Sequence, residues 1–297
     1  MSIITFVNNI EEETGKTMSL VAIATHMAID YNNKILVIST TNKEDKMKNC
    51  YFEEKQVKKL RLGIFGENKS TIESESGIEG IAKIARSNKL TPQIITNYTR
   101  VVFKDRLEIL LGAEKQEEKD EENENNENDK DVEEKKKEIA EEYIDLINVA
   151  SMYYDKVFVD LDNNLSEEIR QKILDRSDLI VLNTSQNYAS LKKLKENKEK
   201  NELLKSPKTL ILIGRYDKHS KYNSKNVTRY LEEKNQVLTI PYNTLYFEAT
   251  NEAGVPDLFL KFKKLSDSED RNAIFIEEVK RATENINYRL QELQARI

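Results

Sequence analysis

Short, mostly apolar runs recur from one end of this chain to the other, and they constrain the fold more than any other feature. The runs cover residues 3–7, 34–38, 107–111, 157–160, 179–182, 210–213 and 237–241. A strand with both faces buried is apolar throughout, whereas a strand with one solvated face alternates. Stretches with helical spacing, such as 77–87 and 138–154, separate the runs. We therefore expect an α/β fold: a doubly wound, mostly parallel sheet covered by helices on both faces.

The first apolar run leads into a turn that ends in Gly15-Lys16-Thr17, and an apolar helical stretch follows from Met18. This arrangement has the outline of a phosphate-binding P-loop. In such a loop a lysine reaches the β- and γ-phosphates, a hydroxyl binds Mg²⁺, and backbone N–H groups surround the phosphates. We expect Gly15, Lys16, Thr17 and Met18 to bind nucleotide. The alternative is an ordinary strand–turn–helix unit in which Gly15 turns the chain and Lys16 is solvated.

The interior of the same turn is acidic. Ile10 stands where the motif has its first glycine, and Glu11, Glu12 and Glu13 follow. Glycine is favoured there because the backbone approaches the ligand and takes positive φ. Two like unit charges about 4 Å apart repel by roughly 4 kcal/mol at an effective dielectric of 20. The sequence therefore predicts weak binding of Mg-ATP and weak or absent hydrolysis.

A carboxylate ends the fourth apolar run. Asp160 follows Val157-Phe158-Val159, so the predicted sheet places it at the same edge as the turn at Gly15. Ligands of doubly wound folds bind at this edge. We expect Thr17 and Asp160 to hold Mg²⁺. The alternative is a strand-end aspartate that caps the next turn.

Composition narrows the class and the compartment. The chain has 297 residues, 38% of them hydrophobic, which is enough for one large core or two small ones. A net charge of −6 and a pI near 5.4 argue against a chain-wide affinity for nucleic acid. A lone cysteine, Cys50, excludes an internal disulfide. With neither a secretion signal nor a transmembrane run in the sequence, we expect a cytoplasmic protein.

Residues 114–137 read EKQEEKDEENENNENDKDVEEKKK, with Val132 as the one apolar residue. Such a segment buries too little apolar area to offset its ordering entropy, so we expect a disordered acidic insert. We expect a single domain over 1–297 that contains this insert. A long helix over 269–297 ends it, and could pack on the core or form a dimer contact. Its mixed charges do not indicate a membrane anchor.

The segment 215–226 is basic within an acidic protein. It combines four cationic residues with two tyrosines: Arg215, Lys218, Lys221, Lys225, Tyr216 and Tyr222. Basic residues interleaved with aromatic ones can hold phosphates or stack on bases. The alternative is a solvated loop in which Asn223 or Ser224 caps a helix over 225–233.

In their order and spacing these segments resemble the ParA/MinD family of P-loop ATPases, which position plasmids, septa, pili and secretion machines. The resemblance covers nearly the whole chain outside the acidic insert. The opening strand with Gly15-Lys16-Thr17 resembles the family's deviant Walker A loop, and 154–162 resembles its Walker B-type strand. Residues 240–242 are similar to the segment near the adenine. The resemblance implies a P-loop NTPase fold, ATP and Mg²⁺ as cofactors, and a homodimer formed through the P-loop face.

Several positions depart from the family pattern. Glu11 stands where the family has a lysine that reaches the partner's nucleotide, and Glu12 and Glu13 replace paired glycines. Residues 39–43 lack the acid that places the attacking water, and Gly214-Arg215 replaces a base-reading asparagine. The resemblance therefore implies a degenerate member in which hydrolysis is lost before binding. Divergent Walker A loops are typical of the TadZ/CpaE-like branch, which localises pilus machinery.

These observations predict a degenerate nucleotide-switch protein that positions a larger assembly, such as pilus or secretion machinery, through protein contacts. Two alternatives remain open. One is an active partition ATPase that binds DNA non-specifically as an ATP-bound dimer. The other is a pseudo-ATPase scaffold that binds no nucleotide. Nucleic acid is not the favoured partner.

Overall fold

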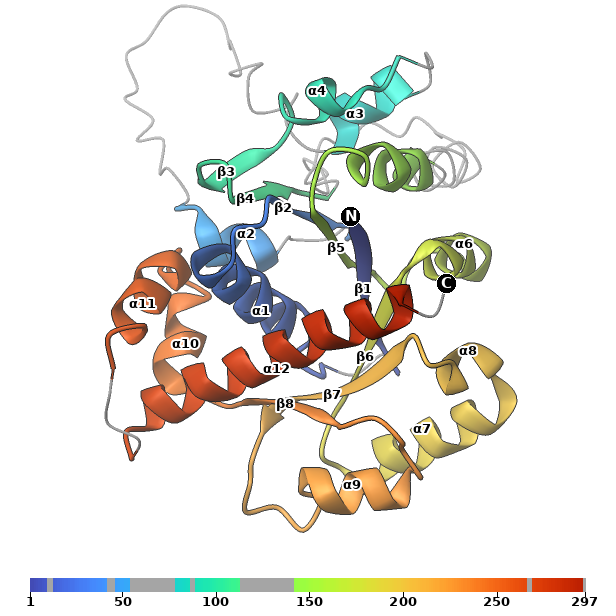
Figure 1. The fold of residues 1–297 in the computed structure, drawn as a ribbon, viewed down its shortest axis with the longest axis vertical. Coiled ribbons are helices and arrows are strands. Elements are labelled where there is room, and N and C mark those ends of the chain that lie inside the picture. Colours follow the sequence, from blue (N-terminus) through green and yellow to red (C-terminus); the bar gives the residue numbers. More distant parts are fainter. Residues whose placement is uncertain are drawn as a thin grey trace, which may run out of the picture.

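An eight-stranded sheet forms the centre of the molecule in the computed structural model, which describes residues 1–9, 13–41, 46–53, 78–85, 89–112, 142–265 and 269–295 (Figure 1). The strand order is β3-β4-β2-β5-β1-β6-β7-β8. The strands are β1 (Ser2–Asn8), β2 (Ile35–Ser39), β3 (Arg100–Phe103), β4 (Leu107–Leu110), β5 (Lys156–Asp160), β6 (Leu179–Thr184), β7 (Thr209–Tyr216) and β8 (Leu238–Pro241). β3 is antiparallel to β4, and all the other neighbouring pairs are parallel. This confirms the doubly wound, mostly parallel sheet.

Helices cover both faces of the sheet. On one face lie α1 (Lys16–Asp30), α2 (Lys46–Tyr51), α10 (Thr244–Ala249), α11 (Val255–Phe262) and α12 (Arg271–Gln294). On the other lie α3 (Ile78–Ala85), α4 (Pro92–Ile95), a helix over 142–150, α6 (Glu167–Arg176), α7 (Tyr188–Lys200), α8 (Glu202–Lys205) and α9 (Ser224–Tyr230). Because alternate strand residues point to opposite faces, Ile4 and Phe6 of β1 join the first core, and Ile3 and Val7 join the second.

α12 is the long C-terminal helix expected over 269–297, with slightly narrower bounds. It begins after Asp270, whose Oδ1 accepts hydrogen bonds from the backbone N–H groups of Asn272 (2.6 Å) and Ala273 (3.2 Å). The helix packs on β8, α1 and α11, and it crosses in front of the sheet in Figure 1. Its buried face includes Phe275 and Ile286. α12 is therefore part of the core.

The structure adds one strand to the expected elements and changes the bounds of two expected helices. The edge strand β3 was not predicted, because its residues are only partly buried or exposed and its apolar run is three residues long. The helix expected to continue to 154 ends at 150, where a turn begins. The helix expected over 225–233 covers Ser224–Tyr230, since Glu232 takes a left-handed φ of 55°. The insert at 114–137 falls outside the described residues.

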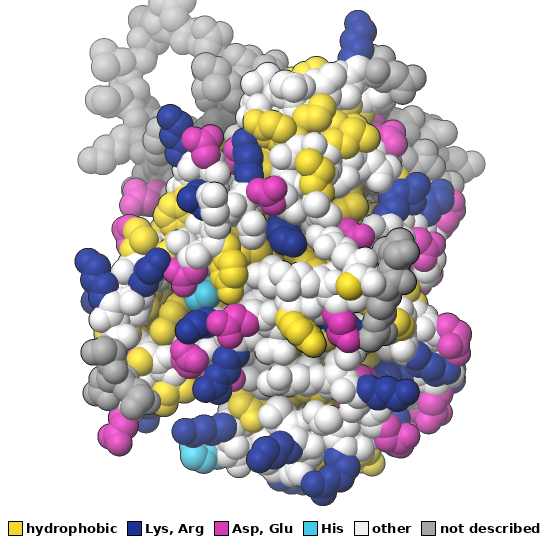
Figure 2. Space-filling view, in the orientation of Figure 1, with side chains coloured by type: hydrophobic (Ala, Val, Ile, Leu, Met, Phe, Trp, Pro, Cys, Tyr) yellow, Lys and Arg dark blue, Asp and Glu magenta, His cyan; other side chains and the backbone are white. Residues whose placement is uncertain are grey.

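The surface mixes Lys and Arg with Asp and Glu over most of the face seen in Figure 2, while dark-blue side chains gather along its lower edge. Within the described ranges, no helix combines the length and the apolar character needed to cross a membrane.

Candidate nucleotide site

The turn between β1 and α1 is built around Gly15. Its φ of 78° lies in the left-handed region, which glycine adopts at little cost. The backbone N–H of Ser19 donates to the Gly15 carbonyl at 2.9 Å and so begins α1. The Thr14 hydroxyl donates to Asn8 Oδ1 at 2.5 Å and fixes the turn to the end of β1. The first N–H groups of α1 and its positive dipole end therefore lie at this turn, an arrangement suited to anions.

Lys16 and Thr17 both contact Asp160, although about 140 residues separate them in sequence. Lys16 Nζ lies 2.8 Å from Asp160 Oδ1 and also donates to the Leu161 carbonyl. Thr17 Oγ1 donates to Asp160 Oδ2 at 2.7 Å. Lys16 is 9% exposed and Asp160 6% exposed, so each charge needs the other. The parallel pairing of β1 with β5 brings these groups together.

Asp160 has capacity left for a ligand. Its Oδ1 is buried and makes no well-directed hydrogen bond with any described residue, despite the ion pair with Lys16. Mg²⁺ takes oxygen ligands and usually keeps waters and substrate phosphates among them. A hydroxyl at Thr17 and a carboxylate at Asp160 fit that requirement. Across the described part of the chain, His, Cys, Asp and Glu form no group of three that could hold a metal by themselves.

Glu13 lies at the mouth of the site between two cations. Its Oε1 is 3.1 Å from Lys46 Nζ, and its Oε2 is 3.4 Å from Arg215 Nη2. Lys46 first, and then Arg215, hold the pKa of the Glu13 carboxyl below its ordinary value. Lys46 and Arg215 therefore compensate the Glu13 charge. The sequence alone had suggested an unpaired glutamate that repels phosphate. Glu11 and Glu12 lie outside the described residues.

These side chains line a pocket of about 570 Å³, a volume that includes space open to solvent. Its lining comprises Asn8, Glu13, Thr14, Gly15, Lys16, Thr17, Met18, Lys46 and Arg215. A second pocket of about 320 Å³, which again includes space open to solvent, shares Gly15, Met18 and Arg215 with the first. The two therefore adjoin at Arg215.

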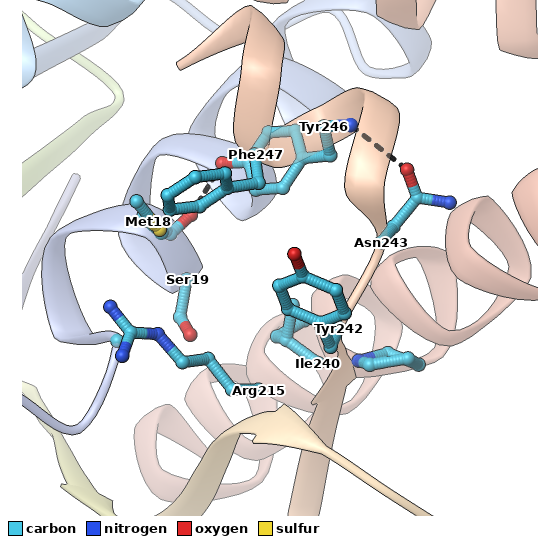
Figure 3. Close-up of a pocket in the computed structure, with 10 residues that line it drawn as sticks. Met18, Ser19, Arg215, Ile240, Tyr242, Asn243, Tyr246 and Phe247 are labelled. Carbon is cyan, nitrogen blue, oxygen red and sulfur yellow. Dashed lines mark hydrogen bonds between the residues drawn. The ribbon is translucent and has the colours of Figure 1, made fainter. Parts of the chain in front are cut away.

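The second pocket is mainly aromatic and aliphatic (Figure 3). Tyr242 and Phe247 border its opening, with their ring centroids 6.3 Å apart, and remain 56% and 39% exposed. Tyr246 is buried beneath, and its hydroxyl donates to the Met18 carbonyl at 2.6 Å, which ties α10 to α1. The Asn243 side chain caps α10 by accepting from the Tyr246 N–H at 2.9 Å. Aromatic rings beside an anion site are typical of a base pocket, but the enclosed space here is only about 20 Å³, so a base would have to displace Tyr242 or Phe247.

Gly214 allows the two parts of the site to approach each other. A Cβ at this position would lie 2.3 Å from the Thr14 carbonyl oxygen and 3.1 Å from Ser19 Oγ. Arg215 follows with a left-handed φ of 52°, a conformation that costs a non-glycine residue about 1 kcal/mol or more. This backbone turn directs Arg215 toward both pockets.

The structure thus brings all the predicted site residues together: Gly15, Lys16, Thr17, Met18 and Asp160. Sequence reasoning missed Lys46, since nothing in its local sequence indicates a contact with Glu13. It noted Arg215 only as a departure from the family pattern and as part of a basic segment. The left-handed φ that turns Arg215 toward the pockets is a property of the folded backbone, and no sequence signal indicates it.

No family model matches the sequence, and neither does any curated protein. Solved structures do match the fold. The cell division ATPase MinD of Pyrococcus furiosus superposes with a TM-score of 0.62 at 14% identity, over 97% of this chain and 99% of that one. A ParA family ATPase from Chlorobium tepidum TLS gives 0.61 at 14%, over 93% and 95%. A putative plasmid partition protein from Borrelia burgdorferi B31, bound to AMPPNP, gives 0.57 at 17%, over 98% of both chains.

Identities of 14–17% establish a common fold and leave activity open. The likeness extends over nearly the full length of the chains compared and includes the sheet on whose carboxyl edge Gly15, Lys16, Thr17 and Asp160 meet. The protein has the fold of the ParA and MinD P-loop ATPases.

Proposed function

We propose that this protein binds Mg-ATP weakly, hydrolyses it slowly or not at all, and acts as a nucleotide switch that positions a larger assembly through protein contacts. One observation carries the proposal: Lys16 and Thr17 converge on Asp160 beside an open pocket. A cation, a hydroxyl and a carboxylate are the side chains that a magnesium-bound triphosphate requires.

Each group has a distinct role in this proposal. Lys16 would bind the β- and γ-phosphates, together with the first N–H groups of α1. Thr17 and Asp160 would hold Mg²⁺, which neutralises phosphate charge when it is bound. The base would enter the second pocket between Tyr242 and Phe247. The Borrelia protein bound to AMPPNP has the same fold, which supports a nucleotide as the ligand class.

Weak turnover follows from the residues around Asp160. Thr40 follows β2, and its hydroxyl donates to the Asp160 carbonyl at 3.1 Å and accepts from the Asp162 N–H at 2.8 Å. Thr40 therefore ties two strand ends together and offers no carboxylate to activate water. Glu13 holds Lys46 and Arg215 in ion pairs at the pocket mouth, so these two cations are engaged when a phosphate approaches.

The positioning role rests on the fold shared with the ParA and MinD proteins. We place this chain in a pilus or secretion system, as a homodimer that meets through its P-loop face. Exposed apolar side chains next to the pocket, Tyr242, Leu245 and Phe247, support a protein contact there.

The test combines calorimetry with a phosphate-release assay on the full chain. We expect a weak heat of Mg-ATP binding that is lost in Lys16→Ala and retained in Lys261→Ala, a matched change on the exposed side of α11. Phosphate release should stay near background. Sustained turnover that Lys16→Ala abolishes would establish an active partition-type ATPase instead. A wild-type chain with no heat of binding would establish a scaffold without nucleotide.

A further inference from the structure

A second surface, remote in sequence from the P-loop, concentrates positive charge. It is formed by residues 186–195, at the start of α7, and by residues 216–230, which run from the end of β7 through α9. Together these segments hold seven Lys and Arg and one Asp, whereas the whole chain holds 47 Lys and Arg against 53 Asp and Glu. Basic side chains gather at the lower edge of Figure 2, where Figure 1 shows α9. The two segments therefore carry a positive net charge, whereas the net charge of the whole chain is negative.

Three tyrosines meet on this surface. Tyr188 stacks on Tyr222 with ring centroids 6.3 Å apart and planes 20° from parallel. Tyr230 lies 6.2 Å from Tyr188 at 56°. Tyr222 and Tyr230 pack partly against the core, while Tyr188 remains 53% exposed. Tyr222 and Tyr230 therefore support the exposed ring of Tyr188.

Cations surround the rings. Lys221 Nζ lies 5.0 Å from the Tyr222 centroid, and Lys195 Nζ lies 5.3 Å from that of Tyr230. Lys195 also pairs with Glu232 at 2.8 Å, so that carboxylate is compensated. By contrast, Lys218, Lys221 and Lys225 are exposed and form no ion pair with any described carboxylate. Their charges are available to an anionic partner.

The loop that carries these groups is held in place by side-chain hydrogen bonds. Gln186 accepts from the Asp217 N–H at 2.7 Å and donates to the carbonyls of Asp217 and Tyr222 at 3.0 Å each. Asn223 caps α9, and Asn226 donates to the Lys221 carbonyl at 2.8 Å. A surface ordered in advance loses less conformational entropy on binding.

We propose that this tyrosine–lysine surface, made up of Tyr188, Tyr222, Tyr230, Lys218, Lys221 and Lys225, binds single-stranded nucleic acid. An unpaired base would stack on the exposed ring of Tyr188, and the phosphates on either side would contact the lysines. A duplex hides its base faces in its own stack, so the aromatic contribution is available to single strands alone. This site is separate from Lys16 and Asp160 and needs no bound ATP.

The test is fluorescence anisotropy of a labelled oligothymidylate with the full chain. Tyr188→Ala should weaken binding about tenfold, the usual effect of removing one stacking ring. The matched control is Tyr288→Ala on α12, where the tyrosine is 66% exposed, and it should have no effect. Changing Lys218, Lys221 and Lys225 together to Ala should lower the slope of log K against log salt by about 2, since each single-strand phosphate contact contributes roughly 0.7.

Two further measurements keep the outcome decisive. Lys16→Ala should leave oligothymidylate binding unchanged, which separates this proposal from the proposed nucleotide function. An unlabelled duplex of the same length should compete poorly. Absence of binding would overturn the proposal, and so would equal affinity for the duplex with no loss in Tyr188→Ala, because the surface would then be a general polyanion contact.

Discussion

Two pairs of a lysine with a buried carboxylate lie at opposite edges of the same sheet, and they differ in how the carboxylate is enclosed. At the amino ends of the strands, Glu108 Oε2 accepts hydrogen bonds from Tyr154 (2.5 Å) and Thr99 (2.8 Å). Its Oε1 lies 3.4 Å from Lys34 Nζ, which also donates to the Tyr153 hydroxyl at 2.9 Å. The Glu108 carboxylate is therefore fully engaged by neighbouring side chains.

At the carboxyl ends, the Lys16–Asp160 pair borders an open pocket and keeps an oxygen without a well-directed hydrogen bond among the described residues. The helix N-terminus and Gly15 add backbone donors at the same place. The comparison teaches that a buried ion pair by itself is structural. Such a pair becomes a candidate binding site where the lysine or the carboxylate can release the other and bind a ligand instead.

The strongest test of the difference between the two pairs is to remove each carboxylate in turn. Glu108→Ala should lower the free energy of unfolding by about 2–3 kcal/mol, because it leaves the buried Tyr154 hydroxyl without its acceptor and the partly exposed Lys34 without its ion pair. Asp160→Ala should lower it by only about 1–2 kcal/mol, because Lys16 borders an open pocket and keeps the Leu161 carbonyl as an acceptor. Urea unfolding measures both, and equal losses would remove the distinction between the two regions.

The close approach of β7 to the P-loop gives a second test. Gly214→Ala should destabilise the fold by about 2 kcal/mol through the clash with the Thr14 carbonyl, and it should abolish Mg-ATP binding by displacing the turn. Gly254→Ala is the control, because its added Cβ would lie at an ordinary contact distance of 3.4 Å from the Ala249 Cβ. If Gly214→Ala retained full ATP affinity, the turn would not depend on β7.

The glutamates of the Gly15 turn provide a third test, which concerns the site at the carboxyl ends of the strands. Glu13→Gln should tighten Mg-ATP binding several-fold, since it releases Lys46 and Arg215 from their shared carboxylate and removes about 1 kcal/mol of repulsion. Replacing Glu11-Glu12-Glu13 by Lys-Gly-Gly should tighten it further by restoring φ freedom. Calorimetry measures both, with Glu199→Gln as the control. Unchanged affinity in the triple variant would place the glutamates away from bound phosphate.

The pH dependence of the same carboxylate should be small. Because the ion pairs lower the pKa of Glu13 in the folded state, their stabilisation is fully present above its ordinary value and is lost as pH falls through the lowered pKa. Glu13 is 69% exposed at its side chain, so the difference in unfolding free energy from Glu13→Gln should be a few tenths of a kcal/mol. Urea unfolding of both chains between about pH 3 and 7 tests this. A wild-type advantage that grows as pH falls would contradict it.

The smallest effect is expected for the acidic insert, which joins the strand of Glu108 to the helix over 142–150. Replacing residues 114–137 with a short linker should leave the melting temperature within about 5 °C, since each doubling of loop length changes the closure entropy by only about 0.6 kcal/mol. Thermal unfolding and limited proteolysis measure the outcome. A larger drop would make the insert a structural part of the domain.

The fold was largely predictable because the signals for it are local. Apolar runs mark strands buried on both faces, and all seven correspond to strands of the sheet. β3 escaped prediction because its apolar run, Val101-Val102-Phe103, is only three residues long. What identifies it is its antiparallel partner β4, and pairing partners cannot be read from local composition.

By itself the sequence determined the α/β architecture, the Gly15 turn and the presence of Lys16, Thr17 and Asp160 on strand and helix ends facing one edge. Tertiary structure alone decided that Lys16 rests on Asp160, that Glu13 lies between Lys46 and Arg215, and that Tyr188 stacks on Tyr222. The physical reason is that periodicity specifies which face of an element is buried, whereas strand order specifies which distant side chains meet. Strand order is a property of the whole core.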